Sequence, residues 1–290
     1  MTDETLRRAE RFIHMFILPA IIVFGIIGNL FNIYIFTRPS LYRSCSIYFL
    51  AGTFNGLALL LFGTTSRWLA FSFDGLDGTQ RSLFFCRFRH YLINIIYNLA
   101  PYFIACVTVD RFCSSSANVT IRRLSSRPHV AYKVIGGIVV ITSIAFSHVL
   151  VFFTIEDMKC QTRPGFYTSF FPFFATLYYF TALVIIILFG LGTIYNIRVQ
   201  SRRMQPMTKQ VDRKRQRSDG QLLVMLFVHV STYACFALPY HGTLIAASVY
   251  PAFTYDSLFI FIQRMTIIAL NLSQAVSVAL SQGPVTRIRT

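Results

Sequence analysis

The chain has 290 residues, of which 54% are hydrophobic, 16% are aromatic and only 13% are charged, and its formal net charge is +16. A soluble domain carries roughly 25% charged residues, and thirty phenylalanines with fifteen tyrosines are too many for one water-soluble core to bury. Lipid-facing surface accommodates such side chains without cost, so the composition excludes a soluble globular domain and indicates a protein embedded in a membrane.

Runs of about 20 mostly apolar residues predict transmembrane helices. Seven such runs lie at residues 12–36, 46–71, 85–113, 130–154, 170–197, 221–249 and 257–280. The first run is too long for a removable signal peptide and lacks a small-residue cleavage site, so we expect it to remain as a helix. The connections are short apart from residues 114–129 and 198–220. The sequence therefore predicts an all-α membrane protein in which residues 1–290 form one bundle of seven helices.

Charged residues alternate between the two sides of this predicted bundle. Seventeen of the 27 basic residues lie in four segments, which hold Arg38 and Arg43, then Arg111, Arg122, Arg123, Arg127 and Lys133, then Arg198 through Arg217, and finally Arg287 and Arg289. Eight of the 11 acids lie in the segments between them, namely Asp3, Glu4, Glu10, Asp74, Asp77, Glu156, Asp157 and Asp256.

This alternation predicts the orientation of the chain. Because Lys and Arg mark cytoplasmic loops, we expect the N-terminus outside the cell and the C-terminus in the cytoplasm. The glycosylation sequon at Asn118 then lies in the cytoplasm, where it is not used. A nucleic-acid-binding surface would be one contiguous basic stripe instead, and the anionic lipid of the inner leaflet accounts for part of the basicity.

The third predicted helix begins at Cys86 and ends at the triplet Asp110-Arg111-Phe112. Cys86 and Arg111 are separated by a rise of about 37 Å at 1.5 Å per residue, so they lie at opposite membrane faces. Cys160, in the loop after the fourth helix, shares the outer side with Cys86, where a disulfide can form and persist. A pair of unbonded loop cysteines is the alternative. The other four cysteines, Cys45, Cys106, Cys113 and Cys235, are expected to be free.

In these features the sequence resembles the rhodopsin-like (class A) G-protein-coupled receptors, over nearly the whole chain. The matching positions are Cys86, Cys160, Asp110, Arg111, Phe112 (where the family has Tyr), Gly28, Asn29 and Pro239. The resemblance implies that the two outer cysteines are bonded and that a heterotrimeric G protein is the partner. It also implies that a kink at Pro239 lets the sixth helix swing outward, and a static kink is the alternative. The run that begins at Asp110 also resembles invertebrate orphan receptors related to neuropeptide receptors.

The resemblance also implies a switch near the cytoplasm. The family places the acidic partner of its inactive-state lock at the start of the sixth helix, where this chain has Asp219. We therefore expect Arg111 and Asp219 to pair in the resting state. In the alternative, Arg111 only reaches lipid phosphate, as arginines at the ends of membrane helices commonly do.

Several residues of the family pattern are absent. The aspartate of the second helix is replaced by Asn55, whose neutral amide lacks the charge that favours a bound cation. The sixth-helix aromatic is replaced by Ala237, and the Asn-Pro-x-x-Tyr ending of the seventh helix is reduced to residues 275–279, with Asn271 as a polar remnant. These losses favour a divergent receptor, and they leave open a receptor-derived scaffold that binds or dimerises without signalling.

The outer halves of the third, sixth and seventh helices should line a ligand pocket. Its candidate polar contacts are Arg89, Asn94, Tyr97, Asn98, Tyr240, His241, Gln263 and Arg264. Arg264 either faces a cavity or extends to the outer surface, and the asparagines, tyrosines and histidine can instead only join helices. Ile93 stands where amine receptors carry an aspartate, which disfavours a monoamine. The acidic outer segments would attract a basic peptide.

Other membrane functions are poorly supported. The seventh helix has no lysine for a retinal Schiff base. The histidines lack metal-ligand spacing and the helix interiors lack a carboxylate cluster, which argues against an intramembrane enzyme. A proton-coupled transporter would need buried acids. We therefore expect a plasma-membrane receptor for an extracellular peptide ligand, with neither metal nor cofactor, no enzymatic activity, and membrane lipid as its surroundings.

Overall fold

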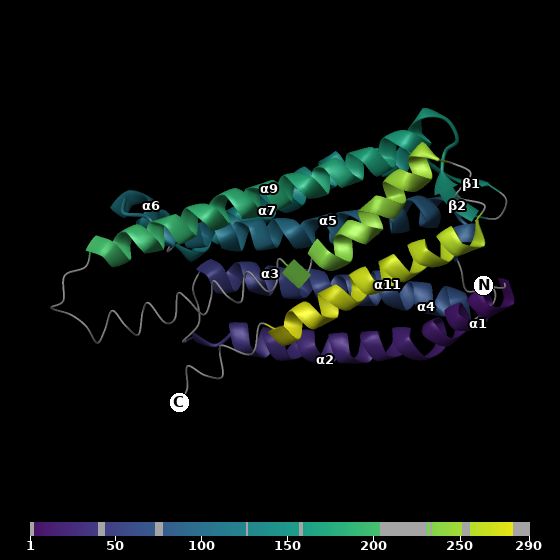
Figure 1. The fold of residues 1–290 in the computed structure, drawn as a ribbon, viewed down its shortest axis with the longest axis horizontal. Coiled ribbons are helices and arrows are strands. Elements are labelled where there is room, and N and C mark those ends of the chain that lie inside the picture. The colour runs from purple at the N-terminus through teal and green to yellow at the C-terminus, as the bar shows by residue number, and fades with distance from the viewer. Residues whose placement is uncertain are drawn as a thin grey trace.

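The computed structural model describes residues 3–39, 44–72, 78–125, 127–156, 159–203, 231–232, 234–250 and 256–280. Within these ranges five helices are long and apolar enough to cross a membrane, namely Glu4–Phe36, Ser44–Ser72, Leu83–Ser114, Pro128–Phe152 and Phe166–Val199. Two shorter apolar helices, Ala234–Val249 and Ser257–Leu272, complete the bundle. The helices run side by side along the long axis of the molecule (Figure 1), and the predicted all-α membrane fold is confirmed.

The first membrane helix begins earlier than predicted. It consists of α1 (Asp3–Phe12), a π-helical turn η1 (Ile13–Ile17) and α2 (Leu18–Phe36) in one continuous rod. The predicted start at residue 12 was therefore too late. The reason is that α1 is polar: it is stabilised by exposed pairs such as Arg8 with Glu4, so hydropathy finds only the apolar continuation of the helix.

The second membrane helix also contains a π-helical turn. It consists of α3 (Ser44–Ala58), η3 (Leu59–Thr64) and α4 (Thr65–Ser72). Thr65 donates a hydrogen bond of 2.8 Å to the Leu60 carbonyl, five residues back, which fits the wider turn. Single π-helical turns inside α-helices are frequent at functional sites, and this one directly precedes the outer segment α4.

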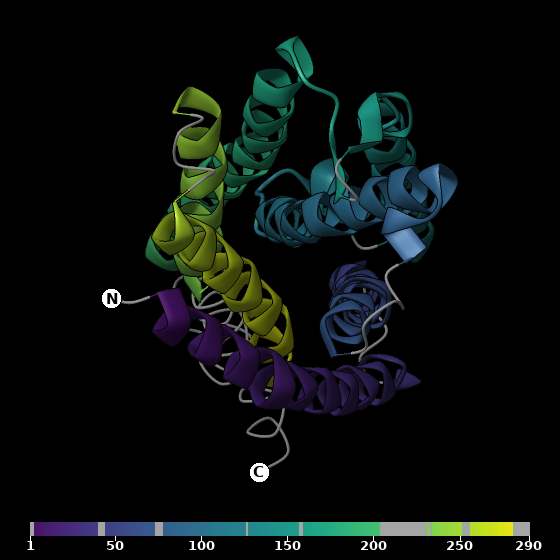
Figure 2. The same cartoon turned by 90° about the vertical axis from the view of Figure 1, so that its right-hand side faces the viewer.

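Helix α5 (Leu83–Ser114) is the centre of the bundle. It packs against α3, α7 (Pro128–Ala145) and α9 (Phe166–Arg203), and in the view along the helices it lies between α3 on one side and α7 on the other (Figure 2). In its most apolar stretch 61% of the residues are buried, against 17–39% in the other four long helices. Those helices must therefore present most of their apolar surface to lipid, as Phe24 on α2 does at 73% exposure.

The end of the fourth helix corrects the prediction of a helix over residues 130–154. The helix breaks between α7 and the short α8 (Val149–Phe152), and the chain then forms strand β1 (Phe153–Glu156). This strand pairs antiparallel with β2 (Lys159–Thr162), and Ile155 lies opposite Cys160. Phe153, Thr154 and Ile155 are aromatic or β-branched residues that favour strands, so apolarity alone placed them in the preceding helix.

The remaining helices agree with the prediction where they are described. Helix α9 extends beyond the predicted 170–197 at both ends, and α11 (Ser257–Leu280) has the predicted limits. Of the predicted helix 221–249, residues 221–230 lie outside the described part and Ala234–Val249 are helical.

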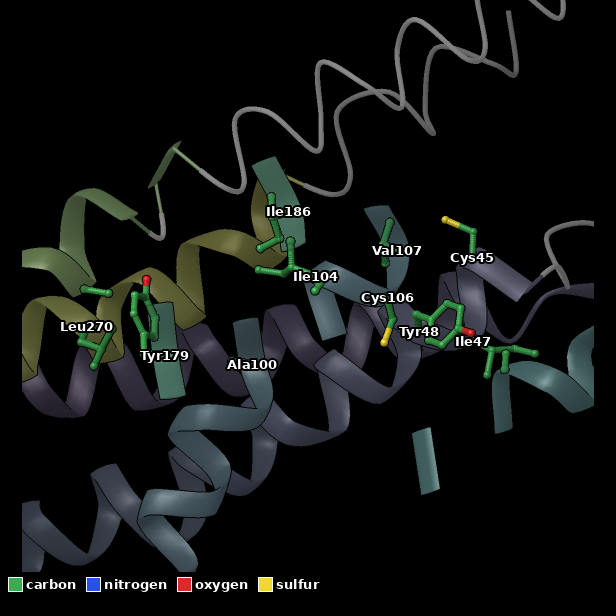
Figure 3. Packing of buried hydrophobic residues seen from close by; sticks show 13 residues of the cluster. Cys45, Ile47, Tyr48, Ala100, Ile104, Cys106, Val107, Tyr179, Ile186 and Leu270 are labelled. Atoms are coloured by element: carbon green, nitrogen blue, oxygen red, sulfur yellow. The ribbon is translucent and has the colours of Figure 1, made fainter. Parts of the chain in front are cut away.

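The main core lies where α5 meets α3, α9, α11 and the helix Ala234–Val249 (Figure 3). It includes Tyr48 and Ile104, with Tyr179, Ala237 and Leu270 toward the hairpin end. In Figure 1 the hairpin β1–β2 and α1 lie at one end of the bundle, whereas α6 (Val119–Ser125) lies at the other. The segments predicted to be outside therefore share one end, called the outer end below.

Candidate functional site

A disulfide closes the outer end of the bundle. Cys86 on α5 is bonded to Cys160 on β2, with their Cα atoms 5.7 Å apart, within the usual range for this bond. Arg87 adds a hydrogen bond of 2.9 Å from its Nε to the Phe153 carbonyl, so α5 holds both strands of the hairpin. The four remaining cysteines are free, as expected.

A cavity lies between α5, α9, α11 and the helix Ala234–Val249. Its lining residues are Asn94, Tyr97, Asn98, Phe171, Ala175, Tyr179, Ala237, Tyr240, His241, Leu244 and Leu270. Five of the eight predicted pocket residues are among them. The volume of the cavity is about 20 Å³, which is enough for one or two water molecules. Ligand pockets measure about 300–1,000 Å³. The cavity as it stands is therefore smaller than an ordinary ligand pocket.

Polar contacts hold the walls of this cavity together. Tyr97 on α5 donates a hydrogen bond of 2.6 Å to the side-chain oxygen of Asn271 on α11, and its ring stacks on that of Tyr240. On the opposite wall, Nδ1 of His241 forms a hydrogen bond of 3.1 Å with the Thr176 hydroxyl of α9. The centres of the His241 and Tyr179 rings are 4.3 Å apart. These aromatic side chains join helices as well as facing the cavity.

The two predicted asparagines behave differently from a helix-bridging pair. The Asn94 amide donates to the His90 carbonyl at 2.8 Å, and the Asn98 amide donates to the Asn94 carbonyl at 2.9 Å. Both bonds stay within α5. Because both side chains also line the cavity, they contribute polar surface there without tying α5 to a neighbour through these amide groups.

The other three predicted pocket residues do not line the cavity. Arg89 donates from Nε to the Ser66 hydroxyl of α4 at 3.2 Å. Arg264 is exposed at the surface, as the alternative prediction had it, and forms an ion pair there with Glu10 of α1. Gln263 is partly buried on the same turn of α11. The Glu10–Arg264 pair instead joins α1 to α11.

One arginine near the cavity was missed by the sequence analysis. Arg67 lies on α4 and is partly buried, and Tyr97 and Tyr240 of the cavity wall are among its electrostatic neighbours. The signal was present in the sequence, because Arg67 is an ionisable residue inside the predicted helix 46–71, and such residues usually face the interior of a membrane bundle. The predicted pocket, however, comprised only residues of the third, sixth and seventh helices.

Several polar residues of the first two membrane helices are buried, among them Asn29 and Asn55. Asn29 is 1% exposed and donates 2.7 Å to the Gly25 carbonyl of its own helix. It approaches α3 so closely that a Cβ on Gly56 would lie 3.1 Å from its side-chain oxygen. Gly28, its predicted motif partner, is partly buried on α2. Asn29 thus lies in the contact between α2 and α3.

Asn55, which replaces the aspartate of the family, joins two helices. Its amide nitrogen donates a hydrogen bond of 2.9 Å to the Ile96 carbonyl of α5, across the helix interface. A carboxylate at this position could not donate that bond. The substitution has therefore converted the position that holds a charge in the family into a neutral link between α3 and α5.

The triplet Asp110-Arg111-Phe112 lies near the end of α5 that is opposite the outer end of the bundle and is called the inner end below. Arg111 lies 3.7 Å from the neighbouring Asp110 carboxylate, between Nη2 and Oδ2. Phe112 packs edge-on against Phe189 of α9, beside Gly192. The predicted partner Asp219 lies outside the described residues, so its pairing with Arg111 stays a prediction. Pro239 lies within the helix Ala234–Val249, at an exposed position.

The apolar helices surround α5, which is bonded to the hairpin at its outer end and carries the Asp-Arg-Phe triplet at the opposite end. This is the arrangement of a seven-helix membrane receptor. The model of the 7 transmembrane receptor (rhodopsin family) matches residues 28–278. The chain therefore belongs to this family. No individual curated protein matches it.

Proposed function

We propose that this chain is a plasma-membrane receptor that binds an extracellular peptide and activates a heterotrimeric G protein, with its N-terminus outside the cell. The observation that carries the proposal is that α5 lines the cavity with Tyr97 and ends with Arg111. The two residues are separated by a rise of about 21 Å at 1.5 Å per residue. A shift of α5 at the cavity thus reaches the inner end directly.

The small volume of the cavity supports a mechanism. A ligand that enters must separate Tyr97 from Tyr240 or break the bond from Tyr97 to Asn271. It would bind only the opened arrangement, and a ligand that binds one of two arrangements more tightly shifts the equilibrium toward it. Pro239 supports the inner-end movement, because a proline removes one backbone hydrogen bond of its helix.

A peptide suits the outer surface better than a monoamine. Ile93 supplies no counter-charge for an amine on α5, while the described part of the outer end carries the exposed or partly exposed acids Glu4, Glu156 and Asp256. These acids would draw a basic peptide toward the mouth of the bundle by long-range attraction.

A non-signalling scaffold is the second candidate, and two observations favour it. Ala237 is fully buried where the family carries an aromatic side chain, and Asn55 bonds to a backbone carbonyl where the family has a charge. Both changes affect helices that move in an active receptor, while the outer disulfide and the cavity would still allow binding.

A second-messenger assay in cells that express the receptor at the surface separates the two candidates. We expect one or more members of a neuropeptide library to raise the signal, and Tyr240→Ala to lower their potency while the lipid-facing control Tyr195→Ala does not. Activation by a monoamine with no response to any peptide would refute the ligand class. Binding without any second-messenger response would favour the scaffold. Sugar on Asn118 would reverse the proposed orientation.

A further inference from the structure

His14 is a buried histidine near the outer end of the first membrane helix. Its side chain is 2% exposed, although the apolar side chains of Met15 and Phe16 beside it are exposed. It lies on the π-helical turn η1, in which the Leu18 N–H bonds to the Ile13 carbonyl five residues back. Single π-helical turns inside α-helices are frequent at functional sites. The helix here directs its histidine toward the neighbouring helices and its apolar side chains toward lipid.

The side chain of His14 contacts one aromatic ring and one carboxylate. Its ring stacks on that of Phe71 of α4, with 4.1 Å between the ring centres and 18° between the planes. Nε2 lies 3.9 Å from the Glu10 carboxylate, which suits an ion pair of a charged histidine and is too long for a hydrogen bond. Nδ1 is buried and, among the described residues, has no hydrogen-bond partner. Stacking and packing therefore hold the ring.

The carboxylate beside His14 already has a partner. Glu10 forms an ion pair with Arg264, which joins α1 to α11. A second arginine comes from α4, because Arg67 lies four residues before Phe71 and shares one face of that helix with it. Helix α2, which also packs against η1, carries no charged residue. The charged groups that these elements direct toward His14 are thus one carboxylate and two guanidinium groups.

We propose that His14 is a proton-sensitive switch whose protonation releases Arg264 from Glu10 and so separates α1 from α11. Because Nε2 faces the carboxylate, it carries the hydrogen of the neutral imidazole, and a proton from water binds Nδ1. In the closed arrangement the new N–H is buried without an acceptor, which is unfavourable. The new charge also competes with Arg264 for Glu10 and repels the guanidinium groups. Separation of α1 from α11 lets water reach the ring, so a proton binds the open arrangement more tightly.

The direction of the pH dependence follows from this difference in proton binding. A histidine in water has a pKa of about 6.5. The closed arrangement is therefore at full strength above this pH and weakens as the pH falls below it.

Helix α11 connects the switch with the cavity. Arg264 and Asn271 are seven residues apart, which is about two turns, so they lie on the same side of α11. Asn271 accepts the hydrogen bond from Tyr97 at the edge of the cavity. A shift of α11 on release of Arg264 thus acts on the cavity wall, and the proton becomes a second effector beside the proposed peptide.

The test is hydrogen–deuterium exchange of the ligand-free receptor in phosphatidylcholine nanodiscs at pH 7.5 and 5.5. Mass spectrometry follows the peptides that cover α1. This helix has 10 residues, and isolated helices so short are marginal in water, so its release should speed the exchange of its amides. Both faces of a nanodisc meet the same buffer, so the result does not depend on the orientation of the chain.

Four variants isolate the switch. His14→Gln cannot take up the proton, and His14→Phe also keeps an aromatic ring to stack on Phe71. Arg264→Gln removes the ion pair to Glu10. His129→Gln, at an exposed histidine near the start of α7, is the control. The intrinsic exchange rates change with pH in the same way in all of them, so each rate is compared at the same pH.

Relative to His14→Gln, wild type should lose up to about tenfold of its α1 protection between pH 7.5 and 5.5. This is the largest change that one proton on a group with a pKa of about 6.5 can cause over that interval. His14→Phe should behave like His14→Gln, and His129→Gln should behave like wild type. Arg264→Gln should show weaker α1 protection than wild type at pH 7.5.

Three results would overturn the inference. The first is an equal pH response in wild type and His14→Gln. The second is stronger α1 protection of wild type at pH 5.5, which would mean that charged His14 tightens the contact through Glu10. The third is lost protection at pH 7.5 in both His14 variants without a pH response in wild type, which would make His14 a packing residue only. The experiment contains neither peptide nor G protein, so the switch can fail while the proposed receptor function stands.

Discussion

Tyr97 on α5 and Asn271 on α11 are 174 residues apart in sequence and are joined by a hydrogen bond of 2.6 Å between their side chains. Asn271 is 1% exposed, so its side-chain oxygen has no access to water when this bond is absent. The bond joins the central helix to the last helix at the edge of the cavity. It supplies a polar link between the third and seventh helices in a chain that lacks the usual polar ending of the seventh.

Tyr97→Phe should destabilise the receptor by about 1–3 kcal/mol, because it leaves the Asn271 oxygen buried without its donor. The phenylalanine ring keeps the stacking on Tyr240, so the change isolates the hydrogen bond. The measurement is thermal unfolding in detergent. Tyr195→Phe, on a ring that is 69% exposed, is the control and should leave the unfolding temperature unchanged. Equal unfolding temperatures for Tyr97→Phe and wild type would mean that the bond contributes nothing to stability.

The positions of the membrane helices could be predicted from the sequence because each apolar run is long enough to cross a bilayer. The polar helix α1 and the hairpin β1–β2 could not. The residues of α1 carry no apolar signal, and Phe153 to Ile155 carry an apolar signal that does not distinguish helix from strand. Tertiary contacts that the sequence does not show also hold them: Glu10 of α1 pairs with Arg264, and Cys160 of the hairpin is bonded to Cys86.

The site was predicted in part for a similar reason. Residues in the outer half of α5 could be assigned to a pocket, and Tyr97 and Asn98 do line the cavity. Which side chains pair with each other could not be inferred, because a pairing depends on how helices rotate and tilt against one another. Arg264 was therefore expected at the pocket although Glu10, from the far end of the sequence, holds it.

Gly192→Ala should destabilise the contact between α5 and α9. A Cβ at Gly192 would lie 2.8 Å from the Phe112 ring, which real side chains cannot tolerate, so the ring must move. Overpacking of this kind costs about 1–3 kcal/mol. Gly190→Ala is a matched control two residues away, because its Cβ would meet Thr108 at an ordinary 3.8 Å. Phe112→Leu should recover part of the loss in the double variant, as measured by thermal unfolding, and equal effects of the two glycine substitutions would contradict the close contact.

Asn55→Asp should weaken the contact between α3 and α5 at neutral pH. The carboxylate would place a second acceptor opposite the Ile96 carbonyl, in place of the amide donor found there. We expect a loss of about 1–3 kcal/mol, and a smaller loss for Asn55→Ala, which removes the bond without bringing two acceptors together. Since wild type lacks the charge, its unfolding temperature should be the same in sodium and in choline chloride. A clear stabilisation of wild type by sodium would show that a cation binds despite the amide.

Removing either half of the disulfide should reduce the amount of receptor at the cell surface. Loss of a native disulfide typically costs about 2–5 kcal/mol, and here it would also free the hairpin from α5. Cys86→Ser, Cys160→Ser and the double variant should show equal losses by flow cytometry, because each removes the same bond. Cys235→Ser, at a free cysteine, is the control. Peptide mapping without reduction that found both thiols free would refute the bond itself.

The last prediction concerns the inner end, where Arg111 should pair with Asp219 in the resting receptor. Asp110 is an adjacent alternative partner, 3.7 Å from the guanidinium. A pair close to lipid headgroups and basic neighbours is worth on the order of 1 kcal/mol. Where the active arrangement is about 0.1–10% populated, losing that much raises its population several-fold. Asp219→Asn nearly conserves size and removes the charge, so basal second-messenger signalling should rise several-fold at equal surface density.

Arg111→Ala completes the experiment, because it distinguishes the reasons for a negative result. If Asp219→Asn signals no more than wild type, either Arg111 relies on Asp110 or on lipid, or the replacements at Asn55 and Ala237 have already disconnected the inner end from the cavity. In a signalling receptor, Arg111→Ala should abolish the response to an activating peptide while leaving peptide binding intact. In a scaffold it should change neither binding nor basal signal. A peptide response that survives Arg111→Ala would remove Arg111 from the coupling mechanism altogether.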